Sequence, residues 1–415
     1  MQPSYGDLFR VFGRIGLLSF GGPAAQIALM HTELVDRHKW LNENQFLGAL
    51  SFCMLLPGPE AMQLATYAGW RLRGTLGGLI AGGLFVLPGA MVILVLAMGY
   101  AAYGQVPVIQ ALFMGIKAAV VVIVLQALLS LSRRALKGWD SWALAGLGFV
   151  AMFFFSVPFP AIIATAALWG FVIRNGNVEN PPEESIPKHY FSTTKTVSLW
   201  LAIWGFPILI SWAYGNEFLT DIAVFFSKLA VVTFGGAYAV LAYMTQSVVE
   251  THGWLSTTQM IDALGLAETT PGPLILVTQF VGHLAGHQEG GVMLALTSGL
   301  LTLWVTFAPC FLWIFAGAPY VETLLARPRL KGALSAISAA VVGVILNLSV
   351  WFALHVLFTQ ILPGSFGPLP VLSSFNPLAA GFVILAAILL LGFRRSMITT
   401  LFIMAVCAGS LHLVF

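Results

Sequence analysis

The sequence predicts an all-α polytopic membrane protein built from two related halves. Of its 415 residues, 59% are hydrophobic and 8% are charged, whereas a soluble domain carries about 25% charged residues. The mean hydropathy is +0.91. A membrane span needs about 20 predominantly apolar residues, and the sequence contains many such runs. Over residues 12–59 the first half repeats in the second at a constant spacing of 214 residues, and Ala118-Ala119-Val120-Val121 matches Ala339-Ala340-Val341-Val342 at a spacing of 221. These observations exclude a soluble globular domain.

Apolar runs bounded by polar residues, glycine or proline predict about thirteen membrane segments. The polar stretch Asn175–Lys195 is typical of a linker. We therefore expect an N-terminal repeat over residues 1–174, a linker with one linking helix (Val197–Tyr214) over 175–219, and a C-terminal repeat over 220–415. The other twelve segments are expected near 7–30, 46–70, 76–103, 107–132, 141–156, 158–174, 222–246, 259–285, 290–318, 331–359, 376–393 and 396–415.

The duplication rests on two motifs. Phe20-Gly21-Gly22 recurs as Phe234-Gly235-Gly236, and Pro57-Gly58-Pro59 recurs as Pro271-Gly272-Pro273, both at the same offset. Over residues 12–59, 17 of 48 positions are identical to their counterparts. Two such halves are typical of secondary carriers.

The basic residues predict that the halves are inserted in opposite orientations. Short cytoplasmic loops collect Lys and Arg. Basic clusters follow the second and fourth segments of the first half, but the third and fifth of the second half. This inversion predicts a cytoplasmic N-terminus and a periplasmic C-terminus. The clusters are Arg71/Arg73, Arg133/Arg134/Lys137, Arg327/Arg329/Lys331 and Arg394/Arg395.

Both motifs interrupt apolar runs, so we expect broken helices. Proline removes a backbone donor, glycine is a poor helix former, and broken backbone at membrane depth must be satisfied by protein or a water-filled cavity. A restarting helix presents free N–H groups and positive dipole that favour anions. The alternative is that these residues only permit kinks and close packing. The candidate anion-binding residues are Gly21, Gly22, Gly235, Gly236, Pro57, Gly58, Pro59, Pro271, Gly272 and Pro273.

Three basic residues are candidates for contacting the anion. Arg14 and Lys228 are related by the same offset, each six residues before its Phe-Gly-Gly, and Lys117 lies within an apolar run. Ionisable groups at membrane depth are functional candidates by default. For Arg14 and Lys228 the alternative is snorkelling to the membrane interface.

Other polar residues near the motifs suggest further roles. Gln63 and Thr270 are candidate donors to an oxyanion, as are Gln26, Gln279 and Thr269, although such side chains also bridge helices. Glu60 and Glu268 flank the Pro-Gly-Pro motifs and are candidates for proton coupling, since burial favours the protonated form. Their alternative role is as structural partners of a nearby base.

No enzyme, cofactor or metal chemistry is predicted. Cys53, Cys310 and Cys407 lie far apart in apolar runs and are expected to be buried structural thiols. His283 and His287 are spaced i, i+4, but they lie where a helix is expected to meet a loop and have no neighbouring acid beyond Glu289, so no metal site is expected. A net charge of +3 with no phosphate loop gives no indication of nucleic-acid binding.

The chain resembles the chromate ion transporter family in its long, two-domain form. The resemblance lies in Phe20–Pro23, Trp40-Leu41, Pro57–Ala65 and Gly69-Trp70, with a second copy in Phe234–Gly236, Trp254-Leu255 and Thr269–Pro273. It implies export of chromate across the bacterial inner membrane and chromate resistance. Sulfate, of the same shape and charge, is the alternative substrate.

The expected activity is therefore secondary active transport of an oxyanion by alternating access between the two repeats. An anion channel and a membrane-bound redox enzyme are the alternatives from other classes. The expected partners are the oxyanion and the lipid bilayer, and the oligomeric state is left open, with a homodimer among the options.

Overall fold

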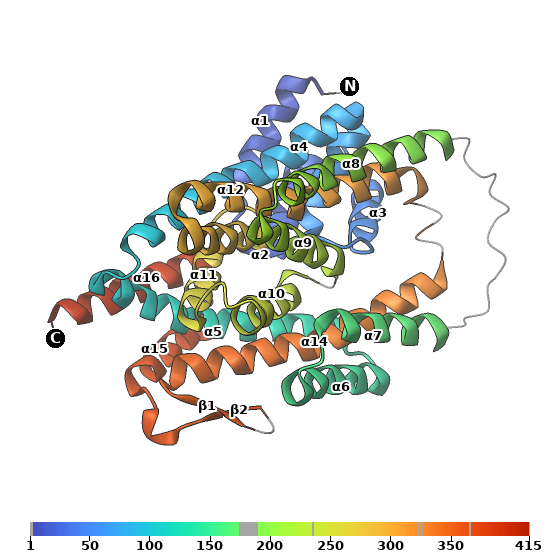
Figure 1. Cartoon of the computed structure of the whole chain (residues 1–415). Helices are drawn as coiled ribbons and strands as arrows, with labels where there is room; N and C mark the ends of the chain where they lie inside the picture. The colour runs from blue at the N-terminus through green and yellow to red at the C-terminus, as the bar shows by residue number, and fades with distance from the viewer. Residues whose placement is uncertain are drawn as a thin grey trace. The chain divides into compact units, whose positions relative to one another are not determined.

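The computed structural model describes residues 3–173, 190–234, 236–321, 324, 327–364 and 367–414, and within them the chain is almost entirely helical (Figure 1). Residues 175–189 of the predicted linker, like Gly235, lie outside the described residues. The first half contains α1 (Tyr5–Leu18), α2 (Gly22–His31), the π-helical turn η1 (Thr32–Arg37), α3 (Glu43–Cys53), α4 (Glu60–Tyr103), α5 (Pro107–Ala135), α6 (Trp139–Phe155) and α7 (Phe159–Ile173).

The linking helix and the second half follow in the same order. They contain α8 (Tyr190–Ala213), α9 (Glu217–Val232), α10 (Ala237–Gln246), η2 (Ser247–Thr251), α11 (Thr257–Thr269), η3 (Leu274–Leu276), α12 (Val277–Gly317), η4 (Ala318–Tyr320), α14 (Pro328–Leu357), β1 (Ile361–Gly364), β2 (Gly367–Pro370), η5 (Leu372–Ser374), α15 (Pro377–Ala387), η6 (Ile388–Gly392) and α16 (Met397–Val414).

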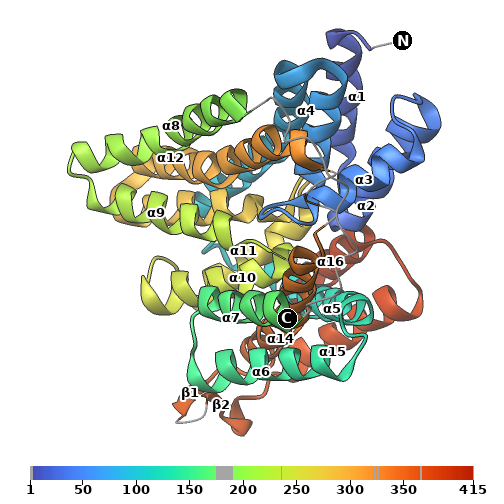
Figure 2. The same ribbon diagram turned by 90° about the vertical axis from the view of Figure 1, so that its right-hand side faces the viewer.

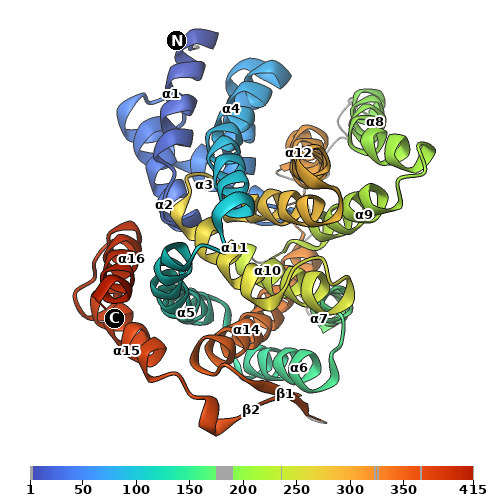
Figure 3. The same cartoon turned by 60° about the vertical axis from the view of Figure 1, so that its left-hand side comes forward.

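Both halves contribute to each of two compact units. Unit 1 comprises Met1–Ala97, Phe171–Ala237 and Thr270–Gly332, and unit 2 comprises Met98–Gly170, Tyr238–Thr269 and Ala333–Phe415. In unit 1, α8, α9 and α12 pack side by side (Figure 2). In unit 2, α15 and α16 pack on α5 (Figure 3). The two units do not coincide with the repeats predicted over residues 1–174 and 220–415, and the boundaries of those repeats remain a prediction.

The interruptions predicted at both motifs are confirmed. Helix α1 ends at Leu18 and α2 begins at Gly22, while α3 ends at Cys53 and α4 begins at Glu60. The second half breaks at the equivalent places, between α9 and α10 and between α11 and α12. Gly21, Gly58, Gly236 and Gly272 have φ of 90°, 123°, 110° and 90°. Only glycine adopts such angles at little cost, which explains its place in each break.

The local backbone is duplicated as well as the sequence. The π-helical turns η1 and η2 occupy equivalent residues, and a Trp follows each of them. The backbone N–H of Trp40 donates to Leu34 O at 2.8 Å, and that of Trp254 donates to Val248 O at 2.9 Å. Equivalent capping pairs then start α3 and α11, Asn42 with Gln45 and Ser256 with Gln259.

Two long helices are in fact helical hairpins. Within α4, Arg73 and Gly74 leave the helical region (φ −142° and 64°), and within α12, Gly290 and Gly291 do the same (φ −154° and 73°). Gly69 lies against Gly77 and Gly282 against Thr302, so the chain reverses at each bend. The segment boundaries predicted near residues 70–76 and 285–290 therefore correspond to tight turns.

Membrane-spanning length and composition are reached by five helical stretches among the described residues: Glu60–Tyr103, Pro107–Ala135, Thr193–Ala213, Leu274–Tyr320 and Pro328–Leu357. Shorter apolar helices accompany them. Large apolar side chains such as Met91, Leu147 and Met293 are 69%, 65% and 77% exposed, as expected of surfaces that face lipid. The chain is thus an all-α polytopic membrane protein, and the total of thirteen segments stays a prediction.

Two local expectations need correction. Cys53 and Cys310 are buried, but Cys407 is exposed on α16, because an apolar run in a membrane protein includes a face that packs on no other helix. No element is predicted from the sequence between the segments 331–359 and 376–393, yet β1 and β2 pair there in antiparallel register, with Ile361 opposite Pro370.

Substituting Gly58 by Ala is expected to lower the apparent melting temperature of the detergent-solubilised protein. The left-handed region costs a non-glycine residue about 1–2 kcal/mol. A β-carbon at Gly58 would also lie 2.7 Å from Gln63 Nε2 and 3.0 Å from Cys310 Sγ. The matched control is Gly83→Ala in α4, where a β-carbon meets nothing within 4 Å. Equal melting temperatures for the two variants would contradict the argument.

Candidate functional site

The four breaks meet in two reciprocal pairs within unit 1. The Gly58 N–H, in the first Pro-Gly-Pro, donates to Thr233 O at 2.8 Å, and Thr233 directly precedes the second Phe-Gly-Gly. The Gly272 N–H donates to Ser19 O, also at 2.8 Å. Each Pro-Gly-Pro break is therefore held by the residue that ends the first helix of the other half. Broken backbone that could not persist in lipid is satisfied here by protein.

Side-chain amides complete this arrangement. Gln26, buried on α2, donates from Nε2 to Gly272 O at 2.7 Å and Ser19 O at 3.2 Å. Gln63 donates from Nε2 to Pro57 O at 2.7 Å. Both amides thus bridge backbone at the breaks, which is the alternative that the sequence left open for such residues. Val240 stands at the position equivalent to Gln26, so the two breaks differ chemically.

Each break also leaves a helix start. The N-cap of α2 is Gly21, in the left-handed conformation, and no side chain caps this end. Helix α4 begins with Glu60 in its first turn, just after Pro59. Thr270 is buried at the second Pro-Gly-Pro. Uncapped N–H groups and the positive end of a helix dipole favour an anion.

The two duplicated basic residues have different surroundings. Arg14 Nη1 lies 3.6 Å from Glu33 Oε1, and its side chain is 53% exposed. Arg37 and His38 approach the same buried carboxylate, at 3.3 and 3.5 Å. Lys228 is exposed on α9, and Ser247 replaces Glu33 in the second half. Sequence reasoning missed Glu33, because its partners are set by the π-helical turn η1.

Lys117 lies in a cavity of unit 2. Its ammonium is 2.9 Å from Asp262 Oδ1, and the hydroxyl of Tyr100 donates to Asp262 Oδ2 at 2.7 Å. Asp262 is 4% exposed. Sequence reasoning missed this acid, although it is a lone carboxylate in an apolar stretch of α11. The cavity has a volume of about 320 Å³ and is lined by Tyr100, Gly104, Gln105, Gln110, Lys117, Ser256, Thr258, Gln259 and Asp262.

The two acids predicted beside the breaks also differ. Glu268 is 4% exposed at the end of α11, and its Oε1 accepts a hydrogen bond from the Tyr238 hydroxyl at 3.0 Å. Glu60 is partly exposed. A buried carboxyl group that faces a neutral hydroxyl has a reason to take up a proton, since burial disfavours its charged form.

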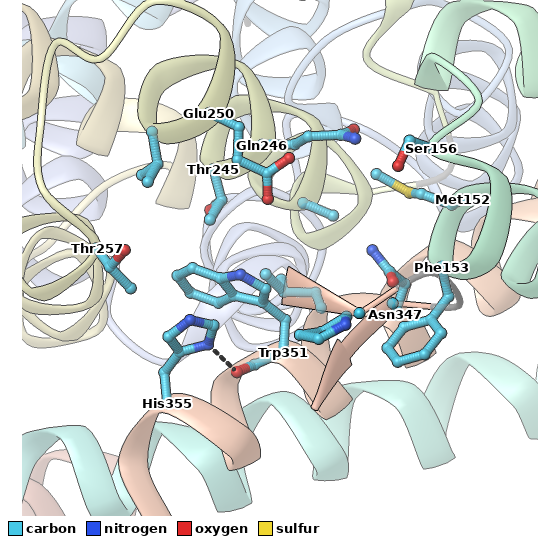
Figure 4. Close-up of a pocket in the computed structure, with 16 residues that line it drawn as sticks. Met152, Phe153, Ser156, Thr245, Gln246, Glu250, Thr257, Asn347, Trp351 and His355 are labelled. Atoms are coloured by element: carbon cyan, nitrogen blue, oxygen red, sulfur yellow. Dashed lines mark hydrogen bonds between the residues drawn. The ribbon is translucent and has the colours of Figure 1, made fainter. Parts of the chain in front are cut away.

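A second cavity of unit 2, of about 300 Å³, contains none of the predicted residues. Figure 4 shows the carboxyl group of Glu250 pointing into it from η2, with Trp351 and His355 on the opposite wall. His355 Nδ1 is 2.8 Å from Trp351 O. Burial raises the pKa of Glu250, and a hydrogen bond from Gln246 partly opposes this rise.

The sequence profile of the family described as "Chromate transporter" matches residues 6–171 and, a second time, residues 220–411. The chain belongs to the chromate transporter family. The two matches begin 214 residues apart, which is the spacing of the breaks. The family domain is therefore present twice.

Curated relatives agree with this membership. A chromate transport protein of Pseudomonas aeruginosa is 30% identical over 354 residues, covering 82% of this chain and 79% of that protein. A chromate transport protein of Cupriavidus metallidurans is 29% identical over 344 residues, covering 82% and 80%. The transporter YwrA of Bacillus subtilis, named as uncharacterised, is 32% identical over 169 residues, which is 40% of this chain and 95% of that protein. No solved structure matches the chain.

Replacing Gln26 by Leu is expected to destabilise the protein by about 1–3 kcal/mol, because Gly272 O then loses a buried donor. The change is measured by heating the detergent-solubilised protein and determining how much of it remains monodisperse at each temperature. Gln105→Leu is the control, since Gln105 is exposed. If both variants unfold like the parent protein, the amide is not needed to join the breaks.

A pH-dependent contribution is expected from His31, at the end of α2. Its pKa is raised by a hydrogen bond to Glu43, whose Oε2 lies 2.8 Å from Nε2, and secondarily by the charges of Glu43 and Asp36. A raised pKa means that the contribution is fully present below the ordinary value of about 6.5, and is lost as pH rises through the folded-state value.

Melting temperatures of the parent protein and His31→Gln should therefore differ most in mildly acidic buffer and converge at alkaline pH. The difference is expected to correspond to less than about 1 kcal/mol, because the pair is partly exposed. A constant difference across the pH range would exclude protonation of His31 as its cause.

Proposed function

We propose that this protein is a secondary active transporter that exports chromate across the bacterial inner membrane and so confers chromate resistance. The observation that carries the proposal is the family domain present twice, with the breaks of one copy hydrogen-bonded to those of the other. Two proteins of similar length bear the name chromate transport protein. The proposal includes a cytoplasmic N-terminus and a periplasmic C-terminus.

The anion is proposed to contact the helix ends at the breaks together with basic side chains. The backbone candidates are those of Gly21, Gly22, Gly235, Gly236, Pro57, Gly58, Pro59, Pro271, Gly272 and Pro273, with Gln63 and Thr270 beside them. Arg14 and Lys228, in the same unit as the breaks, are the proposed sources of positive charge there, and Lys117 is a further candidate for contacting the anion on its path. Backbone donors suit a tetrahedral oxyanion, because N–H groups and a helix dipole stabilise negative charge without a metal.

The transport cycle is proposed to be alternating access between the two copies, with proton coupling through a buried carboxyl group. Glu60 and Glu268 are the candidates beside the breaks. Sulfate is the second candidate substrate, since a site made of donors and positive charge distinguishes poorly between two tetrahedral dianions. An anion channel would show no saturation, and a redox enzyme would convert chromate rather than move it.

Uptake of radiolabelled chromate into proteoliposomes containing the purified protein tests the proposal, with sulfate, phosphate and nitrate as competitors. Arg14→Gln and Lys228→Gln are expected to raise KM about tenfold, because a hydrogen bond to a charged group contributes about 1.5–3 kcal/mol. Arg395→Gln is the matched control, as it removes one positive charge from a loop after η6.

Saturable uptake that is weakened in both test variants and normal in Arg395→Gln supports an oxyanion carrier with these contacts. Normal uptake in all three variants would remove Arg14 and Lys228 from the site while leaving the activity in place. A folded protein that moves no chromate would overturn the assignment of substrate, and sulfate uptake alone would replace chromate by sulfate.

A further inference from the structure

The Lys117 cavity contains one carboxylate in surroundings otherwise made of donors and neutral groups. The ammonium of Lys117, the hydroxyls of Ser256 and Thr258, and the amides of Gln105, Gln110 and Gln259 can all donate hydrogen bonds. The cavity also lies at the N-terminal turn of α11, a helix of 13 residues, where the dipole favours negative charge. This lining suits an anion, and Asp262 is the anion it already has.

The size of the cavity leaves room for a second anion beside that carboxylate. A volume of about 320 Å³ exceeds the share of a single water, about 30 Å³, many times. A tetrahedral oxyanion can therefore enter without displacing a helix. It cannot approach Lys117 in the present geometry without meeting the negative charge of Asp262, whose Oδ1 is 2.9 Å from Nζ.

The charge on Asp262 is held in place by two named groups. Tyr100 donates to Oδ2 at 2.7 Å and Lys117 neutralises Oδ1. Tyr100 and Lys117, on α4 and α5, are the other charged or titratable groups that line this cavity among the described residues. His412, on α16, which also packs on α11, lines a separate cavity. If an oxyanion takes Lys117, the carboxylate is left buried without its counter-charge, which is costly unless it takes up a proton.

The residues of this pair are not duplicated between the two halves of the sequence. Around Lys117 the two halves match at a spacing of 221 residues, so Ser338 stands at the equivalent position; at the spacing of 214, Gly48 is equivalent to Asp262. Lys117 and Asp262 come from different copies, yet neither residue was retained in both. The pair therefore distinguishes one half of the transporter from the other.

We propose that in the anion-free state the carboxylate of Asp262 pairs with the ammonium of Lys117 in the place that the substrate takes later. An entering oxyanion dianion then displaces this carboxylate from Lys117, and the carboxylate takes up one proton. The inference rests on the proposed function and names Asp262, in place of Glu60 or Glu268, as the acid that couples the proton. Anion and proton then enter the site together, so each dianion moves with one negative charge fewer than it carries.

Equilibrium binding of radiolabelled chromate to the purified full-length protein tests this, measured across alkaline pH where chromate itself carries no proton. For the parent protein, the linked proton makes Kd rise with pH by up to tenfold per unit. For Asp262→Asn, which is already neutral, Kd should be lower at high pH and nearly independent of it. Glu250→Gln is the control, as it neutralises an acid that lines the other cavity of unit 2, and it should keep the parent slope.

Two further variants keep the test decisive if Asp262→Asn does not fold. Tyr100→Phe removes the donor that holds the carboxylate charged, so the pH above which binding weakens should move upward. Lys117→Gln should weaken binding at least tenfold, and Lys117→Arg should restore most of it. A parent slope in Asp262→Asn, or an unmoved profile in Tyr100→Phe, would overturn the role of Asp262 while leaving chromate transport intact. A folded parent protein that binds no chromate would instead refute the proposed function.

Discussion

The exchange of backbone hydrogen bonds between the breaks is the constraint on which unit 1 depends. Gly58 donates to Thr233 and Gly272 donates to Ser19, both at 2.8 Å. Each donor is a glycine at positive φ, and each acceptor is a residue whose own hydroxyl bonds back into the helix that it ends, Ser19 to Ile15 O and Thr233 to Leu229 O. Loss of either contact would leave a buried peptide group without its partner, and such groups are expensive away from water.

Much of the architecture could be predicted because it depends on short local motifs and because these motifs occur in both halves of the chain. The Phe-Gly-Gly and Pro-Gly-Pro motifs interrupt helices in both halves of the chain, so both pairs of interruptions could be predicted from the sequence. The bend at Arg73-Gly74 also fell where a basic, glycine-containing stretch separates two apolar runs. Element boundaries were close to expectation for the same reason, as helices such as α5 and α15 begin at a proline.

The contacts of the candidate site could not be predicted in this way. Lys117 and Asp262 are 145 residues apart in the chain, and neither belongs to the repeated motifs, so nothing in the sequence joined them. Arg14 was recognised as duplicated, but its ion pair with Glu33 depends on the π-helical turn that places this acid beneath it. In the sequence Gln26 does not differ from the other polar residues near the motifs. Its hydrogen bond to Gly272 O depends on a contact between the two halves, which the sequence does not show.

The reciprocal arrangement of the breaks has a consequence for chains that contain a single copy of the domain, a length represented by the Bacillus subtilis relative. One copy has a donor in its Pro-Gly-Pro and an acceptor just before its Phe-Gly-Gly, and among the described residues each donor bonds to the acceptor of the other copy. A solitary copy would leave both groups open and would need a second polypeptide, similar or identical, to close them. Fusion of two such genes makes that assembly intramolecular, after which each half is free to diverge, as Lys117, Asp262 and Gln26 have done here.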